Sequence, residues 1–197
     1  MEEKGNPRER LIKSAVDLIY NLGFDSTTIN HLIEASRTHK ASFYRHFQNK
    51  EEIGELYLQL QGQQFANNWK ALMSKSQSRE QFVSVWVSLL KRQIRKNAYH
   101  GCPVARFMAS SEKSSASTEI ARGVLEEWIR TLGDFFFSFE PLNQREEKAR
   151  ERKIVWLKKA KQFIKIFQGN SQLYIITNEL SYIDEMEKEF LDLLKAD

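Results

Sequence analysis

Basic, hydroxyl and aromatic side chains crowd into one short stretch near the N-terminus of this chain. Lys40, Arg45 and Lys50 carry positive charge there, and Ser42 and Tyr44 add hydroxyl groups. Such side chains donate hydrogen bonds to the phosphate oxygens of DNA, and lysine also donates to guanine edges in the major groove. The chemistry that these residue types favour is therefore binding to DNA.

Three short helices would have to position these side chains. A first helix starts after Asn6, which suits a helix cap, and carries apolar residues at helical spacing. A second begins near Thr27 or Thr28, and a third runs from about His39 to Phe47 with one apolar face. The third helix would be marginal alone, so we expect the other two to present it.

A longer series of residues in this region has a specific order and spacing. It resembles the N-terminal DNA-binding domain of the tetracycline-repressor (TetR) family of bacterial transcription regulators, over roughly a quarter of the chain. The resemblance rests on Gly23-Phe24, Thr27-Thr28-Ile29, Leu32-Ile33, Ser42-Phe43-Tyr44, His46-Phe47 and Asn49-Lys50-Glu51.

The turn between the second and third helices departs from the family pattern. The family usually has Gly-Val-Ser there, whereas this chain has Arg37-Thr38-His39. Arg37 is therefore expected to adopt a left-handed or near-bridge backbone that glycine adopts freely, at a modest cost. His39 is also a weaker helix cap than serine.

The resemblance implies two classes of DNA contact. It carries over four phosphate-contacting candidates: Thr28, Tyr44, His46 and Lys50. The residues left to face base edges are Asn30, Lys40, Ala41, Ser42 and Arg45. The net charge of +4 is mild for a nucleic-acid binder, and an ordinary solvated face is the alternative for this basic cluster.

The composition predicts an all-α protein. Only 8 glycines and 3 prolines occur in 197 residues, and no segment alternates with the period of a strand. We predict about nine helices: a three-helix helix-turn-helix DNA-binding domain in residues 1–52 and a helical effector-binding and dimerisation domain in residues 53–197. Beyond the first domain, the predicted helices span about 49–73, 78–97, 103–108, 118–139, 144–176 and 179–196, with a loop at 111–117 and a bend or interruption near 169–170.

The predicted last helix is apolar on one side. Its stripe contains Ile183, Met186, Phe190 and Leu194. Two terminal helices with such stripes suit an antiparallel four-helix interface, and the family resemblance also implies a homodimer formed by the last two helices. The alternative is that the stripe packs wholly within its own subunit.

Aromatic residues in the middle of the chain are candidates for an apolar effector pocket. The single cysteine and one methionine lie among them in the sequence and complete the set. The predicted lining residues are Phe65, Trp69, Trp86, Cys102, Phe107, Met108, Trp128 and Phe135. The resemblance implies that an effector enters this region. The alternative is that aromatic residues at helical spacing are simply core.

Other chemistries find little support in the sequence. Cys102 and His100 could be read as a nucleophile and its base, but no third orienting group or oxyanion site accompanies them. The histidines lack a ligand cluster, and no Gly-rich phosphate loop is present. We therefore predict no enzymatic activity, no metal and no cofactor.

The chain also lacks the features of a membrane or secreted protein. Its apolar runs are far shorter than a membrane span, and its first residues do not form a signal peptide. We expect a cytoplasmic homodimer that acts as a repressor and leaves its double-stranded DNA operator when a small hydrophobic effector binds. The alternative is a helical protein-interaction regulator that has lost specific DNA binding, and the altered turn is the feature that favours it.

Overall fold

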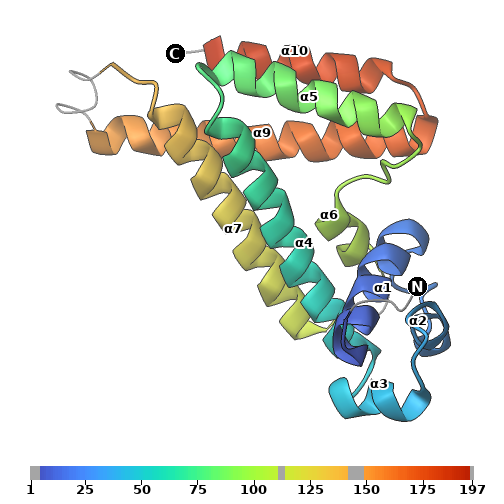
Figure 1. Cartoon of the computed structure of the whole chain (residues 1–197). Helices are drawn as coiled ribbons and strands as arrows, with labels where there is room; N and C mark the ends of the chain where they lie inside the picture. Colours follow the sequence, from blue (N-terminus) through green and yellow to red (C-terminus); the bar gives the residue numbers. More distant parts are fainter. Residues whose placement is uncertain (1–4, 111–113, 142–148, 196–197) are drawn as a thin grey trace. The chain divides into compact units, whose positions relative to one another are not determined.

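The computed structural model describes residues 5–110, 114–141 and 149–195, and within these ranges the chain forms nine α-helices and no strand (Figure 1). The predicted all-α fold class is therefore confirmed. The helices are α1 (Pro7–Leu22), α2 (Ile29–Ala35), α3 (Lys40–His46), α4 (Lys50–Met73), α5 (Arg79–Arg95), α6 (Pro103–Met108), α7 (Ser115–Phe137), α9 (Ala149–Thr177) and α10 (Ser181–Lys195).

Capping side chains begin α1 and α5 close to where the sequence predicts these helices to start. The Asn6 side chain accepts a hydrogen bond from the Glu9 backbone at 3.0 Å, and the Glu9 carboxylate accepts from the Asn6 backbone in return. At the start of α5, the Ser78 hydroxyl accepts from the Gln81 backbone at 3.1 Å. Each bond satisfies a backbone donor that the first helical turn leaves free.

Two local predictions need correction. Residues 115–117 were expected in a loop but belong to α7, because the Ser114 hydroxyl accepts from the Ser117 backbone and caps the helix earlier. The expected interruption near Gly169 is absent, since α9 continues through it to Thr177. The expected start of this helix near residue 144 lies outside the described residues.

The chain divides into two compact units. The first unit comprises residues up to 64 together with 102–124, and the second comprises residues 65–101 together with those from 125 onward. Helices α4 and α7 therefore contribute to both units. The expected boundary of folding domains after residue 52 stays a prediction.

The core of the first unit joins α6 to the N-terminal helices. The Phe107 ring of α6 lies 4.6 Å from the Phe24 ring and 5.8 Å from the Tyr57 ring. Gly54 of α4 makes this approach possible, because a Cβ atom there would come within 2.5 Å of the Phe24 ring and 3.0 Å of the Phe107 ring. Any larger residue at this position would push the rings apart.

The second unit has an aromatic core under three helices. Helices α5, α9 and α10 lie side by side (Figure 1), and α10 contacts both of the others. The Phe190 ring of α10 stacks on the Phe163 ring of α9, with ring centres 3.7 Å apart. It also lies 5.6 Å from the Trp86 ring of α5.

The same packing corrects the predicted dimer interface. Ile183, Met186 and Phe190 are 0% exposed and Leu194 is 6% exposed in the single chain. Because α5 and α9 of their own subunit cover these side chains, they have almost no surface left for a second copy. The intrasubunit alternative is the correct one for this stripe, and a homodimer would need another face.

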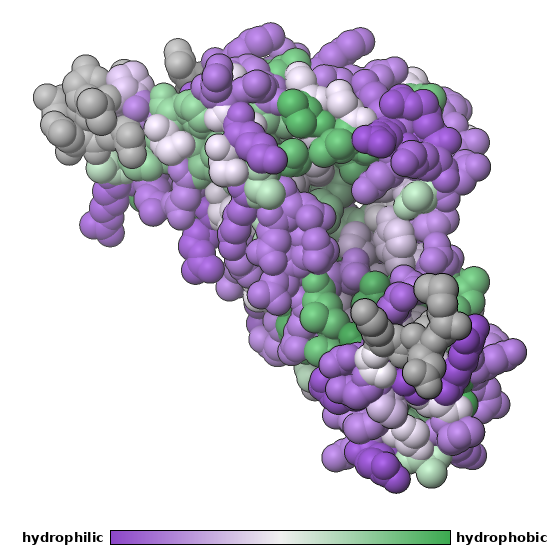
Figure 2. Space-filling view, viewed as in Figure 1, coloured by the Kyte–Doolittle hydropathy of each residue, from purple (hydrophilic) through white to green (hydrophobic). Residues whose placement is uncertain are grey.

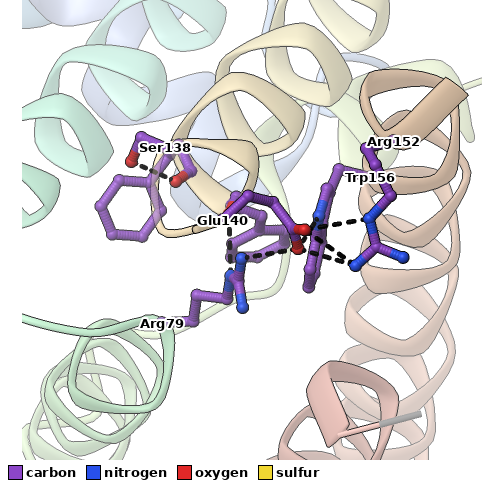
Figure 3. Close-up of polar contacts among 7 residues, drawn as sticks. Arg79, Ser138, Glu140, Arg152 and Trp156 are labelled. Atoms are coloured by element: carbon purple, nitrogen blue, oxygen red, sulfur yellow. Dashed lines mark hydrogen bonds and ion pairs between the residues drawn. The ribbon is translucent and has the colours of Figure 1, made fainter. Parts of the chain in front are cut away.

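One buried carboxylate ties three helical segments of the second unit together (Figure 3). Glu140, just after α7, accepts from Arg79 of α5 at 3.2 Å and from Arg152 of α9 at 2.9 and 3.0 Å. The Trp156 indole donates to the same carboxylate at 2.7 Å. Two cations also lie over the Trp156 ring: the Arg79 guanidinium is 3.8 Å and Lys159 Nζ is 4.5 Å from the ring centre.

The visible surface is mostly hydrophilic (Figure 2). A green patch lies over α5, where Val85 and Leu89 are exposed. Throughout the described ranges, the helices all fall short of the combination of length and apolar character that crossing a membrane requires.

Candidate nucleic-acid interface

Helix α3 has one buried face and one exposed face. Phe43 is 0% exposed and Phe47, which follows the helix, is 2% exposed, with ring centres 5.8 Å apart. Their burial fixes the rotation of the helix. The opposite side leaves Lys40, Ala41, Tyr44 and Arg45 exposed and Ser42 and His46 half-buried.

Helix α2 presents its start to solvent. Thr28 is its N-cap, where the hydroxyl accepts from the His31 backbone at 3.1 Å and His31 Nδ1 accepts from the Thr28 backbone at 3.4 Å. Thr28 and Asn30 are both exposed. The Thr28 hydroxyl keeps its own proton, so it can donate to an acceptor outside the subunit while it caps the helix.

Lys50 is already engaged within the subunit. Its Nζ donates to the Phe24 carbonyl at 3.1 Å and lies 4.4 Å from the centre of the Phe24 ring. These contacts tie the first residue of α4 to the segment that follows α1. A phosphate contact by Lys50 stays a prediction, and it would have to be made beside these bonds.

The turn between α2 and α3 adopts the backbone that the sequence predicted. Arg37 has a φ of 49°, within the left-handed region. Ser36 and Thr38 on either side are buried, and their hydroxyls lie 2.8 Å apart. As expected for a weaker cap, His39 makes no capping bond with its side chain. Arg37 is exposed, and the sequence counts it among the four positive charges from Asn30 to Lys50 without naming a contact for it.

Polar groups line one side of α6. Cys102 directly precedes the helix, Arg106 lies within it and Ser110 lies two residues beyond its end, at intervals of four residues; we call this side the α6 face. Tyr57 of α4 lies close enough for Cys102 and Arg106 to influence its phenol. Burial, reinforced by Tyr20 and Cys102, raises the pKa of the Tyr57 phenol, so its proton stays available for donation.

Three polar atoms around this face are buried and make no hydrogen bond to any part of the chain that the structure describes. They are the Tyr57 hydroxyl, Arg106 Nε and Ser110 Oγ. A buried donor without a partner costs about 1–3 kcal/mol, so each one calls for a physical explanation. Sequence reasoning missed Tyr57, Arg106 and Ser110, because their lack of partners appears only in three dimensions.

The residues predicted to line an effector pocket are divided between the two units. Cys102, Phe107 and Met108 belong to the first unit, and Phe65, Trp69, Trp86, Trp128 and Phe135 belong to the second. In the second unit, the Phe65 ring stacks on Trp128 at 4.4 Å and meets Trp69 at 4.8 Å. These contacts are those of core residues, so a pocket in the second unit stays a prediction.

The family match falls on the region that contains the exposed side chains of α2 and α3. Residues 11–55 match the family described as bacterial regulatory proteins, tetR family. This N-terminal part of the chain is a TetR-family domain. The match covers most of α1, all of α2 and α3, and the start of α4, which are the elements that position the exposed face of α3.

Two curated relatives are similar to part of this chain. It is 39% identical over 46 residues to TcmR, an HTH-type transcriptional regulator from Streptomyces glaucescens, which covers 23% of the chain and 20% of the relative. It is 24% identical over 132 residues to an uncharacterised HTH-type transcriptional regulator in the lacX 3′ region of Lactococcus lactis subsp. lactis. The second match covers 64% of each protein. The similarity therefore spans a fifth of the length of TcmR and just under two thirds of the length of the Lactococcus lactis protein.

Solved structures share the fold over nearly the whole chain. The reduced form of Escherichia coli NemR has a TM-score of 0.75 at 18% identity and covers 95% of this chain and 97% of its own. A TetR transcriptional regulator from Legionella pneumophila has a TM-score of 0.77 at 17% identity, with 98% and 100% covered. At these identities the likeness concerns the fold alone.

Proposed function

We propose that this protein is a DNA-binding transcription regulator that acts as a repressor and responds to a small molecule. The observation that carries the proposal is the two-sided character of α3. Phe43 and Phe47 anchor one side in the core, which leaves Lys40, Ala41 and Tyr44 exposed on the other. A recognition helix needs this division, because a rigidly held helix can place short side chains against base edges.

The DNA contacts can be separated by the effects of two substitutions. Lys40→Ala should change the preference between the DNA upstream of the protein's own gene and an unrelated duplex, by about 1–3 kcal/mol if Lys40 donates to guanine. Tyr44→Phe removes one neutral phosphate donor, so it should weaken binding to both duplexes equally and leave the salt dependence unchanged. Binding measured by fluorescence anisotropy from 50 to 200 mM salt would report both effects. If Lys40→Ala weakened binding to both duplexes equally, α3 would not read the bases.

A homodimer is part of the proposal, because one helix-turn-helix contacts few base pairs and two copies read paired half-sites. The surface that supports it is an apolar stripe on the second half of α9 and the residue that precedes α10. We define the α9 stripe as Ile166, Gly169, Leu173, Ile176 and Leu180. The spacing of three and four residues places the first four on one face of α9, and Leu180 lies between α9 and α10. Leu173, Ile176 and Leu180 are 42%, 69% and 49% exposed, and Gly169 has open space beside it.

The effector that we propose is mainly apolar and carries an acceptor oxygen. The support comes from the α6 face, where the Tyr57 hydroxyl and Arg106 Nε are buried without a partner beside the Phe107 ring. A carbonyl or carboxylate oxygen would satisfy such donors. Helix α6 also contacts α1 directly, since Arg106 Nη2 donates to the Asn21 carbonyl at 3.1 Å. A molecule bound here would therefore act within the unit that contains α3.

A further inference from the structure

We propose that Arg37 is an additional phosphate-contacting residue, which the turn between α2 and α3 directs toward the DNA backbone. The inference rests on the DNA-binding function proposed above and extends it to a position where the family usually has glycine. The turn that departs from the family pattern would then strengthen the DNA-binding surface.

The turn leaves the Arg37 side chain exposed between two buried neighbours. Ser36 and Thr38 are 1% and 9% exposed, and their hydroxyls are joined by a hydrogen bond inside the unit. The Thr38 and Arg37 backbone amides donate to Ile33 and Glu34 carbonyls at 3.0 and 3.1 Å, which fixes the path of the chain. Because both neighbours face inward, the exposed Arg37 side chain extends into solvent.

The guanidinium is free to bind an external anion. Across the described part of the chain, it makes no hydrogen bond or ion pair with another residue. An arginine side chain is always charged, and its fork of donors matches the oxygens of a phosphate group. Arg37 lies three residues before Lys40, the first residue of α3. Since the N-terminal end of a recognition helix enters the major groove, the residues just before it pass the phosphates at the groove edge.

The backbone supplies a second, independent observation. A φ of 49° is costly for arginine, whereas glycine adopts it freely and asparagine tolerates it. The two backbone bonds that end α2, from Thr38 to Ile33 and from Arg37 to Glu34, are those of a helix C-cap whose left-handed residue is usually glycine, and they offset part of this cost. They also hold the residue that carries the guanidinium in one backbone conformation just before α3.

The test compares Arg37→Asn with Arg37→Lys on a duplex of random sequence. An operator is unnecessary, because phosphate contacts carry no sequence information. Arg37→Asn should weaken binding about tenfold, the equivalent of one charge-assisted hydrogen bond. It should also reduce the slope of log affinity against log salt by about 0.9, because one fewer counterion is released. Arg37→Lys should retain the slope and lose only part of the affinity, because the charge remains while the fork is lost.

Two controls separate this effect from misfolding and from general loss of charge. Arg37→Asn should unfold at the same temperature as the wild type or a higher one, because asparagine tolerates the left-handed backbone. Lys75→Asn removes an exposed positive charge from the turn after α4 and should leave affinity and slope unchanged. If the wild type bound with a salt-dependent affinity and Arg37→Asn kept both affinity and slope, the Arg37 proposal would be overturned and the DNA-binding function would stand. If the wild type bound no duplex, both proposals would fail.

Discussion

Glu140 places a negative charge inside the second unit, where an unpaired carboxylate would be costly. Burial alone would raise the pKa of this carboxyl. Hydrogen bonds from Arg152 and Trp156, together with the charges of Arg152 and Arg79, outweigh burial and hold the pKa below its ordinary value. A carboxyl whose pKa is lowered by folding stabilises the folded state above its unfolded pKa, and this contribution is lost as pH falls through the folded pKa.

Glu140→Gln should therefore destabilise the protein in a pH-dependent manner. At pH 7 the substitution leaves two arginines without their shared carboxylate, and we expect a loss of roughly 2–3 kcal/mol in the free energy of unfolding. The difference between variant and wild type should shrink as pH falls below the ordinary glutamate pKa of about 4.3, because the unfolded carboxyl binds its proton first, and it should be lost below the folded pKa. Urea unfolding at pH 7 and at a series of values from about pH 4 downward would measure it.

An exposed ion pair provides the matched control. Glu119 and Arg122 lie three residues apart on α7, with side chains 66% and 60% exposed. Pairs of this kind contribute little to stability. Glu119→Gln should change the free energy of unfolding by less than about 0.5 kcal/mol at either pH. Equal losses for both variants at pH 7 would show that Glu140 acts as an ordinary surface charge.

At the scale of single helices, the α9 stripe provides the test of the homodimer. Ile176→Glu places a charge on its most exposed side chain, so a second copy would have to bury an unpaired carboxylate there. We expect sedimentation velocity to show a monomer with an unchanged helix content. Val85→Glu is the control, because Val85 is similarly apolar and 41% exposed but lies on α5. A monomer with Val85→Glu and a dimer with Ile176→Glu would move the interface to α5.

The helices themselves were largely predictable because their signals are local. Asn6 with Glu9 and Ser78 with Gln81 are separated by three residues, so the capping bonds can be recognised along the chain. The early start of α7 was missed because Ser114 lies within a run of small polar residues that also suits a loop. Local chemistry therefore located the helices better than it located their ends.

The surroundings of each helix were less predictable. The stripe of α10 was recognised as buried, but periodicity cannot tell whether the covering surface belongs to the same subunit or to a second one. The Glu140 network was missed entirely, because Arg79 lies 61 residues away from Glu140 along the chain. In the candidate site, the exposed face of α3 was deducible from Phe43 and Phe47. The engagement of Lys50 with Phe24 was not, because 26 residues separate them.

At the scale of the whole molecule, an effector should couple its own binding to stability and to DNA release. A compound that binds only the folded protein raises the unfolding temperature by mass action. Tyr57→Phe removes the unpartnered hydroxyl without altering the ring. We expect it to stabilise the free protein by about 1 kcal/mol and to weaken an oxygen-bearing effector by roughly three- to tenfold. Thermal shift and competition with DNA would report the two effects.

Tyr182→Phe serves as the corresponding control, because Tyr182 is a half-buried tyrosine of α10 in the second unit. It should leave the affinity for the effector unchanged. If Tyr57→Phe also left that affinity unchanged, the effector would not use the α6 face. The aromatic core of the second unit would then be the next candidate for its site.

The uneven placement of aromatic residues has an optical consequence. All four tryptophans, Trp69, Trp86, Trp128 and Trp156, belong to the second unit. Indole emission excited near 295 nm therefore reports on that unit alone, while far-ultraviolet circular dichroism follows the helices of both. Coincident unfolding curves from the two signals would mean that the units melt together, and separated curves would reveal the one that opens first. The native chain thus contains its own reporter, and no dye is needed to distinguish its two halves.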